Sequence, residues 1–180
     1  YNKLIFYCQL CDIILIYILR GILFMSVINE SFVLETIDMI RLYNLDIRTV
    51  TLALSLRDCI SDDVDKVCDN IHSKILKYAK NLVSYANDFE NEYSIPICNK
   101  RISVTPISLI GEACKNYDYV KIAKTLDNAA KEVGVDFVGG FSALVEKGCT
   151  RGDEALIEAI PEALACTDKV CSSVNLASSK

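Results

Sequence analysis

The sequence contains a single histidine, His72, and lacks two patterns that hold phosphate groups. With one histidine, no metal site that needs two histidine ligands can be built within this chain. There is no Gly-x-Gly-x-x-Gly motif, and Gly140 stands where a P-loop starting at Gly134 would need lysine. No basic run with interleaved aromatic residues is present, and the net charge is -5, which argues against nucleic acid as a partner.

The chain also lacks the usual marks of an internal domain boundary. We find no linker rich in glycine, serine or proline and no repeat of fixed period in its 180 residues. A chain of this length with 52% hydrophobic residues can bury a sizeable core. We therefore expect one domain.

Nine cysteines are present, but an odd number at irregular spacing is not typical of a disulfide framework. In a chain that is long enough to build a core, it favours free thiols in a reducing compartment. Only Cys8 and Cys11 form a Cys-x-x-Cys pair, and no second pair or set of histidines completes a zinc site. No metal site is predicted.

Residues 1–24 differ from the rest because they are almost wholly apolar, interrupted by Lys3, Gln9, Asp12 and Arg20. An aspartate near the middle of a membrane helix costs about 2.5–3.5 kcal/mol on insertion scales, and no signal-peptide exit is present. We expect residues 1–24 to be upstream read-through that is not part of the fold, with the true start at Met25. A membrane anchor is the alternative.

Residues 25–180 show apolar residues at strand and helix periods in alternation. The pattern predicts a β-α-β-α-β-α-β order, and such crossovers give parallel strands. The small residues on the second face of the first strand suggest that this strand is buried on both sides. The predicted elements are a helix at 31–43, a strand at 46–56, one long helix at 62–89 with Ser61 as N-cap, a strand that ends at Val104, a helix at 118–133, a strand at 136–143, a helix at 152–168 and a strand at 169–177.

Residues 99–111 carry the strongest indication of a site. Here a strand runs directly into a helix, with Thr105 at the predicted N-cap and Pro106 at the first helical position. Ligands collect at the carboxyl ends of parallel strands, and free amides at a helix start favour an anion. Lys100 and Arg101 alternate across the strand, so at most one faces a given side. Arg101 either clamps a carboxylate or phosphate or forms an ion pair within the chain.

Three further features have local explanations. Gly134 is predicted to end its helix in a left-handed cap, and Gly139 and Gly140 predict a bulge or a close backbone approach. Three aspartates at 62, 63 and 65 suit the positive end of a helix better than a calcium site, because no calcium-loop spacing is present.

Four segments of the body, at 45–51, 100–110, 134–147 and 169–175, resemble the uncharacterised "PFL family" proteins of bacteria and archaea. The resemblance covers about residues 27–180. It implies a fold like that of pyruvate formate-lyase and ribonucleotide reductase, a ten-stranded α/β barrel made of two parallel halves. Residues 25–180 would then be the N-terminal portion of a longer protein, with parallel βα units that form about half of the barrel. It also implies a cytoplasmic homodimer and implies no activity.

Enzymes of that fold thread a cysteine-bearing loop into the barrel, so the resemblance draws attention to cysteines near strands. Cys171 is the candidate catalytic residue, and the alternative is a buried cysteine that packs as a small hydrophobe. The candidate substrate-binding residues are Arg101, Ser103, Thr105, Ser172, Ser173 and Asn175. If the strands align, the backbone after Val104 and the thiol near Val170 meet at one rim.

Two classes of function stay open from the sequence. In the first, an enzyme or enzyme-like barrel binds a small anionic metabolite at the strand ends, and Cys171 takes part in cysteine-dependent chemistry. In the second, a non-catalytic regulatory homodimer binds a metabolite on the same barrel. No cofactor is specified by either hypothesis, and neither involves nucleic acid or a membrane.

Overall fold

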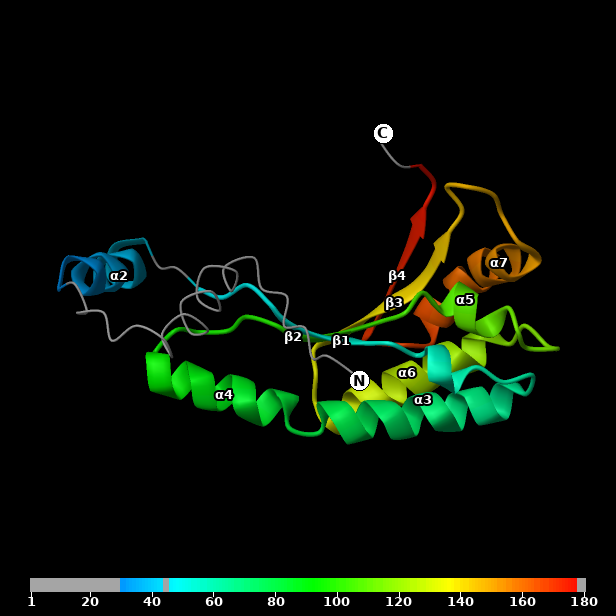
Figure 1. The fold of residues 1–180 in the computed structure, drawn as a ribbon, viewed down its shortest axis with the longest axis horizontal. Helices are drawn as coiled ribbons and strands as arrows, with labels where there is room; N and C mark the ends of the chain where they lie inside the picture. The colour runs from blue at the N-terminus through cyan, green and yellow to red at the C-terminus, as the bar shows by residue number, and fades with distance from the viewer. Residues whose placement is uncertain (1–29, 44–45, 178–180) are drawn as a thin grey trace.

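The computed structural model describes residues 30–43 and 46–177, in which strands alternate with helices from residue 50 onward (Figure 1). This alternation follows the periodic apolar pattern of the sequence. In chain order the elements are α2 (Glu30–Tyr43), β1 (Val50–Leu54), the 3-10 helix η1 (Arg57–Cys59), α3 (Val64–Ala79), α4 (Leu82–Tyr93), β2 (Lys100–Val104), α5 (Ile107–Gly111), α6 (Tyr119–Val133), β3 (Phe137–Leu144), α7 (Arg151–Ala165) and β4 (Val170–Asn175).

The four strands lie in the order β1-β2-β3-β4, and every neighbouring pair is parallel. This confirms the predicted α/β class and the parallel βα units. Pairing between β2 and β3 extends to Ser103 and Gly139, whereas β3 and β4 remain paired as far as Leu144 and Asn175. The last two strands therefore project beyond the first two, as Figure 1 shows.

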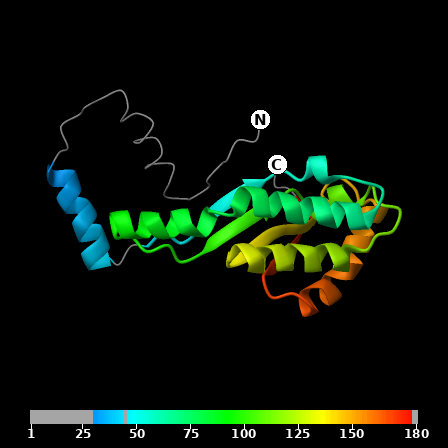
Figure 2. The ribbon, with the colours of Figure 1, turned by 90° about the horizontal axis from the view of Figure 1, so that it is seen from below.

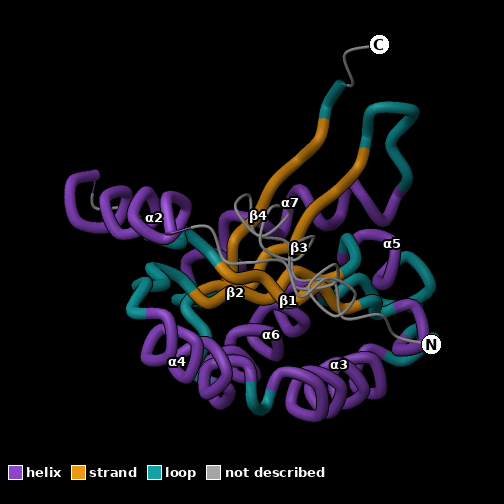
Figure 3. The backbone as a smooth tube through the Cα atoms, turned by 60° about the vertical axis from the view of Figure 1, so that its left-hand side comes forward, coloured by secondary structure: helices purple, strands orange, loops and turns teal. Residues whose placement is uncertain are grey.

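The core lies between the sheet and the helices that return from one strand to the next. Helices α3, α4 and α6 run along one side of the strands (Figures 2 and 3). Three residues that pair across β1, β2 and β3 point into this layer and are buried, namely Leu52, Ile102 and Val138. Ile71 of α3 and Leu126 of α6 pack in the same cluster, as the helical spacing of apolar residues predicts.

The long helix predicted at 62–89 is wrong, because the chain forms two helices that are separated at Lys80 and Asn81. Residues up to Ala79 belong to the main core. Beyond the break, Ala86 packs in a second cluster with Ile47 and Ile97, which precede β1 and β2. The N-cap of α3 is Asp63, which accepts from the Asp65 amide, and not Ser61.

Burial of β1 on both sides is observed only in part within the described part of the chain. Leu52 and Leu54 are buried against the helices, and on the other face Thr51 is buried but Ala53 is exposed. No described helix covers that face of the sheet. We call it the open face, and its strand residues include Ala53, Arg101, Ser103, Phe137, Gly139, Cys171 and Ser173.

Helix α2 confirms the helix predicted at 31–43. It lies apart from the helical layer and the sheet in Figures 1 and 2. The expectations for residues 1–24, and those for Cys8 and Cys11, lie outside the described residues.

Candidate functional site

Strand alternation decides which predicted site residues share the open face. Ile102 and Val104 of β2 are buried against the helices, so Arg101 and Ser103 lie on the opposite side. Lys100 turns toward the helical layer, where its Nζ pairs with Glu90 of α4 at 3.3 Å. This confirms that Lys100 and Arg101 face different sides of the strand.

The register between strands places Ser103 and Cys171 in one row across the sheet. Ser103 pairs with Ala53 on one side and with Gly139 on the other, and Gly139 pairs with Cys171. Since neighbouring strands lie about 4.8 Å apart, the Cα atoms of Ser103 and Cys171 are about 10 Å apart. The four residues of the row, Ala53, Ser103, Gly139 and Cys171, are all small. A Cβ atom added at Gly139 would meet nothing within 4 Å. The row is a shallow, unobstructed strip of the open face.

A bulge in β3 follows this row. Gly140 has φ 117°, and the pairing with β4 shifts between Gly139 and Phe141. A side chain at Gly140 would lie 2.5 Å from the Val104 carbonyl oxygen, so only glycine fits there. The extra residue leaves Gly139 on the open face while it turns Phe141 into the core, where Phe141 is fully buried. The bulge predicted from the glycine pair is confirmed.

Arg101 lies on the open face between Thr51 and Phe137 in the sheet register. Its Nε donates to Thr51 Oγ1 at 3.4 Å, and its guanidinium forms no ion pair within the described residues. Phe137 beside it keeps 40% of its surface exposed. A cation and an exposed aromatic ring therefore border the strip of small residues.

The predicted N-cap role of Thr105 is wrong. The N-cap of α5 is Pro106, with no side-chain hydrogen bond. The Thr105 hydroxyl instead accepts from the Leu56 amide at 3.0 Å, and the Thr105 amide donates to the Leu54 carbonyl at 3.2 Å. These bonds extend the pairing of β1 and β2 past the last strand residues. Thr105 is thus occupied in joining two strand ends.

The residues that follow Cys171 divide between the two faces of β4. Cys171 and Ser173 are exposed on the open face, whereas Ser172 turns toward the helices and its Oγ is buried with no hydrogen-bond partner among the described residues. Asn175 lies at the projecting end of the strand, and its Nδ2 donates to Glu146 at 3.5 Å. The structure therefore places Arg101, Ser103, Cys171 and Ser173 on the same face, with Arg101 before and Ser173 after the row of Ser103 and Cys171. It does not place Thr105, Ser172 or Asn175 beside that row.

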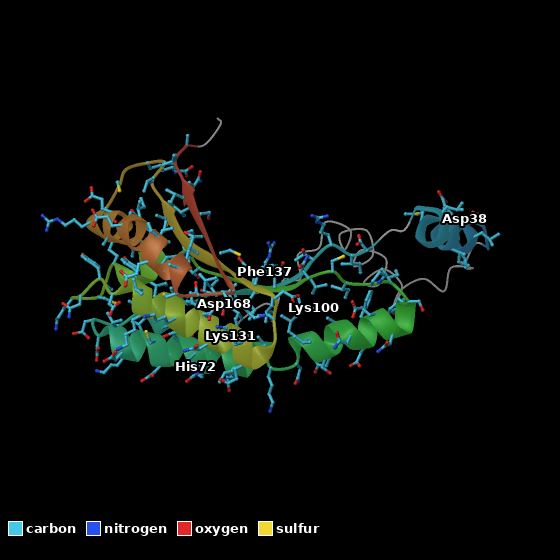
Figure 4. All side chains as sticks on the ribbon, turned by 180° about the vertical axis from the view of Figure 1, so that it is seen from behind. Asp38, His72, Lys100, Lys131, Phe137 and Asp168 are labelled. Carbon is cyan, nitrogen blue, oxygen red and sulfur yellow. The ribbon has the colours of Figure 1, made fainter. Side chains whose placement is uncertain are left out.

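A buried carboxylate that the sequence analysis did not single out fixes the start of β4. Asp127 Oδ1 accepts from the amides of Asp168 and Lys169 at 2.9 and 2.7 Å. Its other oxygen pairs with Lys131 at 2.7 Å, and Lys131 also contacts Asp168 at 2.6 Å. Figure 4 shows Lys131 and Asp168 close together beneath the strands. The network anchors the chain just before Cys171.

The electrostatics of this anchor follow from its contacts. Burial alone would raise the pKa of Asp127, but the Lys131 ammonium and the two backbone amides outweigh it and lower that pKa. Hydrogen bonds to the carboxylates of Asp127 and Asp168 raise the pKa of Lys131 to about 12. The only sequence signal was the spacing of Asp127 and Lys131, which is equally typical of an exposed helix pair.

A charged depression of about 530 Å³ lies where α3 and α6 begin. Its acidic residues are already engaged, because Asp62 pairs with Lys115 at 2.9 Å and Asp65 pairs with Lys121. The described ranges contain no group of three or more potential metal ligands. These contacts agree with the prediction that the aspartates are helix-end charges.

Across residues 30–43 and 46–177, none of the helices combines the length and the apolar character needed to cross a membrane.

Comparison with known proteins gives a family without an assigned activity. The family model described as "Uncharacterised ACR (DUF711)" matches residues 38–180. A UPF0210 protein of Methanosarcina mazei is 58% identical over 153 residues, which are 85% of this chain and 34% of that protein. One from Agathobacter rectalis is 61% identical over 155 residues, again 85% and 34% of the two chains. One from Campylobacter concisus is 61% identical over 148 residues, 82% and 33%. The chain thus spans about a third of the length of these relatives.

Proposed function

The chain belongs to the DUF711 family, and we propose that it forms one part of a larger PFL-like α/β barrel that binds a small anionic metabolite against the open face of its sheet. The observation that carries the proposal is the Arg101 guanidinium. It lies on the open face without a carboxylate partner within the described residues, next to the strip that contains Ser103 and Cys171.

Two features of the sheet support the barrel. Parallel sheets are normally covered on both faces, and here the described helices cover one. Strands β1 and β4 are edges that each pair with a single described neighbour. Further strands from the unmatched two thirds of the relatives would pair with these edges and enclose the open face. Four strands would then be most of one five-stranded half, and residues 25–180 the N-terminal portion of the whole protein.

The chemistry of the open face supports a small anion as the ligand. A guanidinium presents a planar set of donors that matches a carboxylate or phosphate. Small side chains at Ala53, Ser103 and Gly139 leave room beside it, and the hydroxyls of Ser103 and Ser173 add polar groups. Closing the barrel would remove water from around the Arg101 guanidinium and the bound anion, and this would strengthen the attraction between the two charges.

The binding test uses a full-length relative, because this chain spans only about a third of it. Thermal shift is measured with inorganic phosphate and with acetate, pyruvate and succinate, each over a concentration series. We expect at least one of them to raise Tm and an Arg101→Gln change at the aligned position to abolish that rise. Arg57→Gln, which changes an exposed arginine outside the sheet, is the matched control. If no anion raises Tm, or if both variants respond alike, the proposal is wrong.

A cysteine-dependent reaction is the second candidate, and the exposure of the Cys171 thiol on the same row favours it. A Cys171→Ser change should then remove turnover while the thermal shift by the bound anion persists. Cys149→Ser, at another exposed cysteine, serves as the control. Unchanged behaviour of Cys171→Ser would instead support a non-catalytic regulatory homodimer.

We further propose that the full-length protein acts in the cytoplasm as a homodimer. The free thiols at Cys59, Cys68, Cys98, Cys114, Cys149, Cys166 and Cys171 agree with a reducing compartment. Light scattering of a full-length relative, purified from the cytoplasmic fraction, tests both statements.

A further inference from the structure

Helix α2 exposes an unusual amount of apolar surface. Every α2 residue whose burial the structure describes is exposed. Leu34 and Leu42 keep 60% and 70% of their surfaces accessible, and Val33, Ile37 and Met39 are exposed as well. Apolar surface exposed to this extent indicates an interaction site in a native protein.

The apolar side chains are spread around the helix. With 3.6 residues per turn, Val33, Leu34 and Ile37 lie on one side of α2, and Met39 and Leu42 lie on the other. This differs from α3, whose buried residues form one stripe with polar residues opposite. A helix that is apolar on more than one side is buried between other elements.

Helix α2 belongs to the part of the chain that the relatives share. The Methanosarcina mazei match covers 153 of the 180 residues. An unbroken match of that length begins at residue 28 or earlier and ends at residue 153 or later, so it contains all of α2. The family model also begins within this helix, at residue 38. The α2 segment is therefore shared with a protein about 2.5 times as long as this chain.

We propose that α2 is a docking helix that packs against the part of the full-length protein corresponding to the unmatched two thirds of the relatives. Two depressions among the described residues are lined mainly by charged and polar side chains, so neither of them suits this helix. In sequence, α2 comes just before β1, an edge strand that pairs with one described neighbour. A segment corresponding to the unmatched part of the relatives that paired with this edge would lie on the α2 side of the sheet. The inference does not depend on the anion site.

The test places a photocrosslinking side chain in the full-length Methanosarcina mazei relative at the position aligned with Leu34. The control carries the same group at the position of Tyr85, an exposed residue of α4. The protein is prepared as a mixture of ¹⁵N-labelled and unlabelled copies, so links within one copy are distinguished from links between copies by mass. We expect the Leu34 probe to link to residues outside the matched third, within one copy, at several times the yield of the control.

Hydrogen exchange supplies a second readout that needs no substitution. Amides of the aligned helix in the full-length relative should exchange at least about 100-fold more slowly than in a free helical peptide of the same sequence. Links between labelled and unlabelled copies would make a second copy the occupant and overturn the proposal. Links confined to the matched third, or exchange as fast as in the peptide, would also overturn it. The anion site is tested by thermal shift and the docking of α2 by crosslinking and hydrogen exchange. The failure of one proposal can therefore be distinguished from the failure of the other.

Discussion

Ser103 and Cys171 lie in the same row of the open face, two strands apart, with Gly139 between them. They are 68 positions apart in the sequence, and their alignment depends on two strand pairings. The row combines a hydroxyl, a thiol and the open position at Gly139 beside the Arg101 guanidinium, which donates to Thr51 and has no ion pair among the described residues. This arrangement is the basis of the proposed ligand site.

The bulge in β3 makes a pair of adjacent glycines behave differently. Gly140→Ala places a Cβ atom 2.5 Å from the Val104 carbonyl oxygen at φ 117°, and we expect it to lower the free energy of unfolding by about 2–4 kcal/mol. Gly139→Ala meets open space and should change it by less than about 1 kcal/mol. Urea unfolding followed by circular dichroism measures both. Equal losses in the two variants would contradict the bulge geometry.

The buried hydroxyl of Tyr119 has no hydrogen-bond partner within the described part of the protein. Its burial also raises the pKa of Tyr119 well above the ordinary value. Tyr119→Phe removes an unsatisfied polar group and keeps the ring, so we expect the free energy of unfolding to stay the same or rise by about 1 kcal/mol. Tyr78→Phe, at a half-buried tyrosine on α3, is the comparison. A loss above about 1 kcal/mol in Tyr119→Phe would reveal a hydrogen bond that the structure lacks.

The Asp127 anchor should contribute strongly to stability. Asp127→Ala leaves two backbone amides without their acceptor and leaves Lys131 with Asp168 alone, and we expect a loss of about 3 kcal/mol at pH 7. Asp168→Ala removes an exposed carboxylate from the same lysine and should cost less than about 1 kcal/mol. Urea unfolding at pH 7 compares the variants, and similar losses for both would show that burial of Asp127 is unimportant.

The same anchor predicts a pH dependence. The pKa of Asp127 is lower in the folded protein than the ordinary value of 3.8. Its contribution is therefore fully present above the unfolded-state pKa and is lost as the pH falls through the lowered folded-state pKa. The difference in unfolding free energy between the native sequence and Asp127→Ala should stay constant from pH 7 to about 5 and shrink below about 4. A difference that grows on acidification would contradict the direction of the shift.

The free strand edges should make the 180-residue chain associate. Strand β4 contains no charged residue to discourage pairing with another copy. Size-exclusion chromatography with light scattering should show oligomers, and Ser173→Lys on β4 should reduce them. Ser84→Lys, at an exposed position of α4, should have no such effect. A monodisperse native chain that melts cooperatively as a monomer would be evidence against exposed edges.

Local sequence patterns determined much of the fold. The order of strands and helices, the parallel direction, the left-handed cap at Gly134 and the bulge at Gly139 and Gly140 were all predicted. Each depends on residues close together in the chain, where periodicity and glycine geometry act directly. The opposite directions of Lys100 and Arg101 follow from the same alternation.

Only the tertiary structure decided which of these residues meet. Thr105 was predicted to cap a helix, but a partner 49 positions away, the Leu56 amide, occupies its hydroxyl. Asp127 resembles an exposed helix residue until the chain at Asp168 and Lys169 folds over it. The row from Ser103 to Cys171 likewise depends on inter-strand register. Register is set by packing between distant segments, so the local pattern of any one strand contains no record of it.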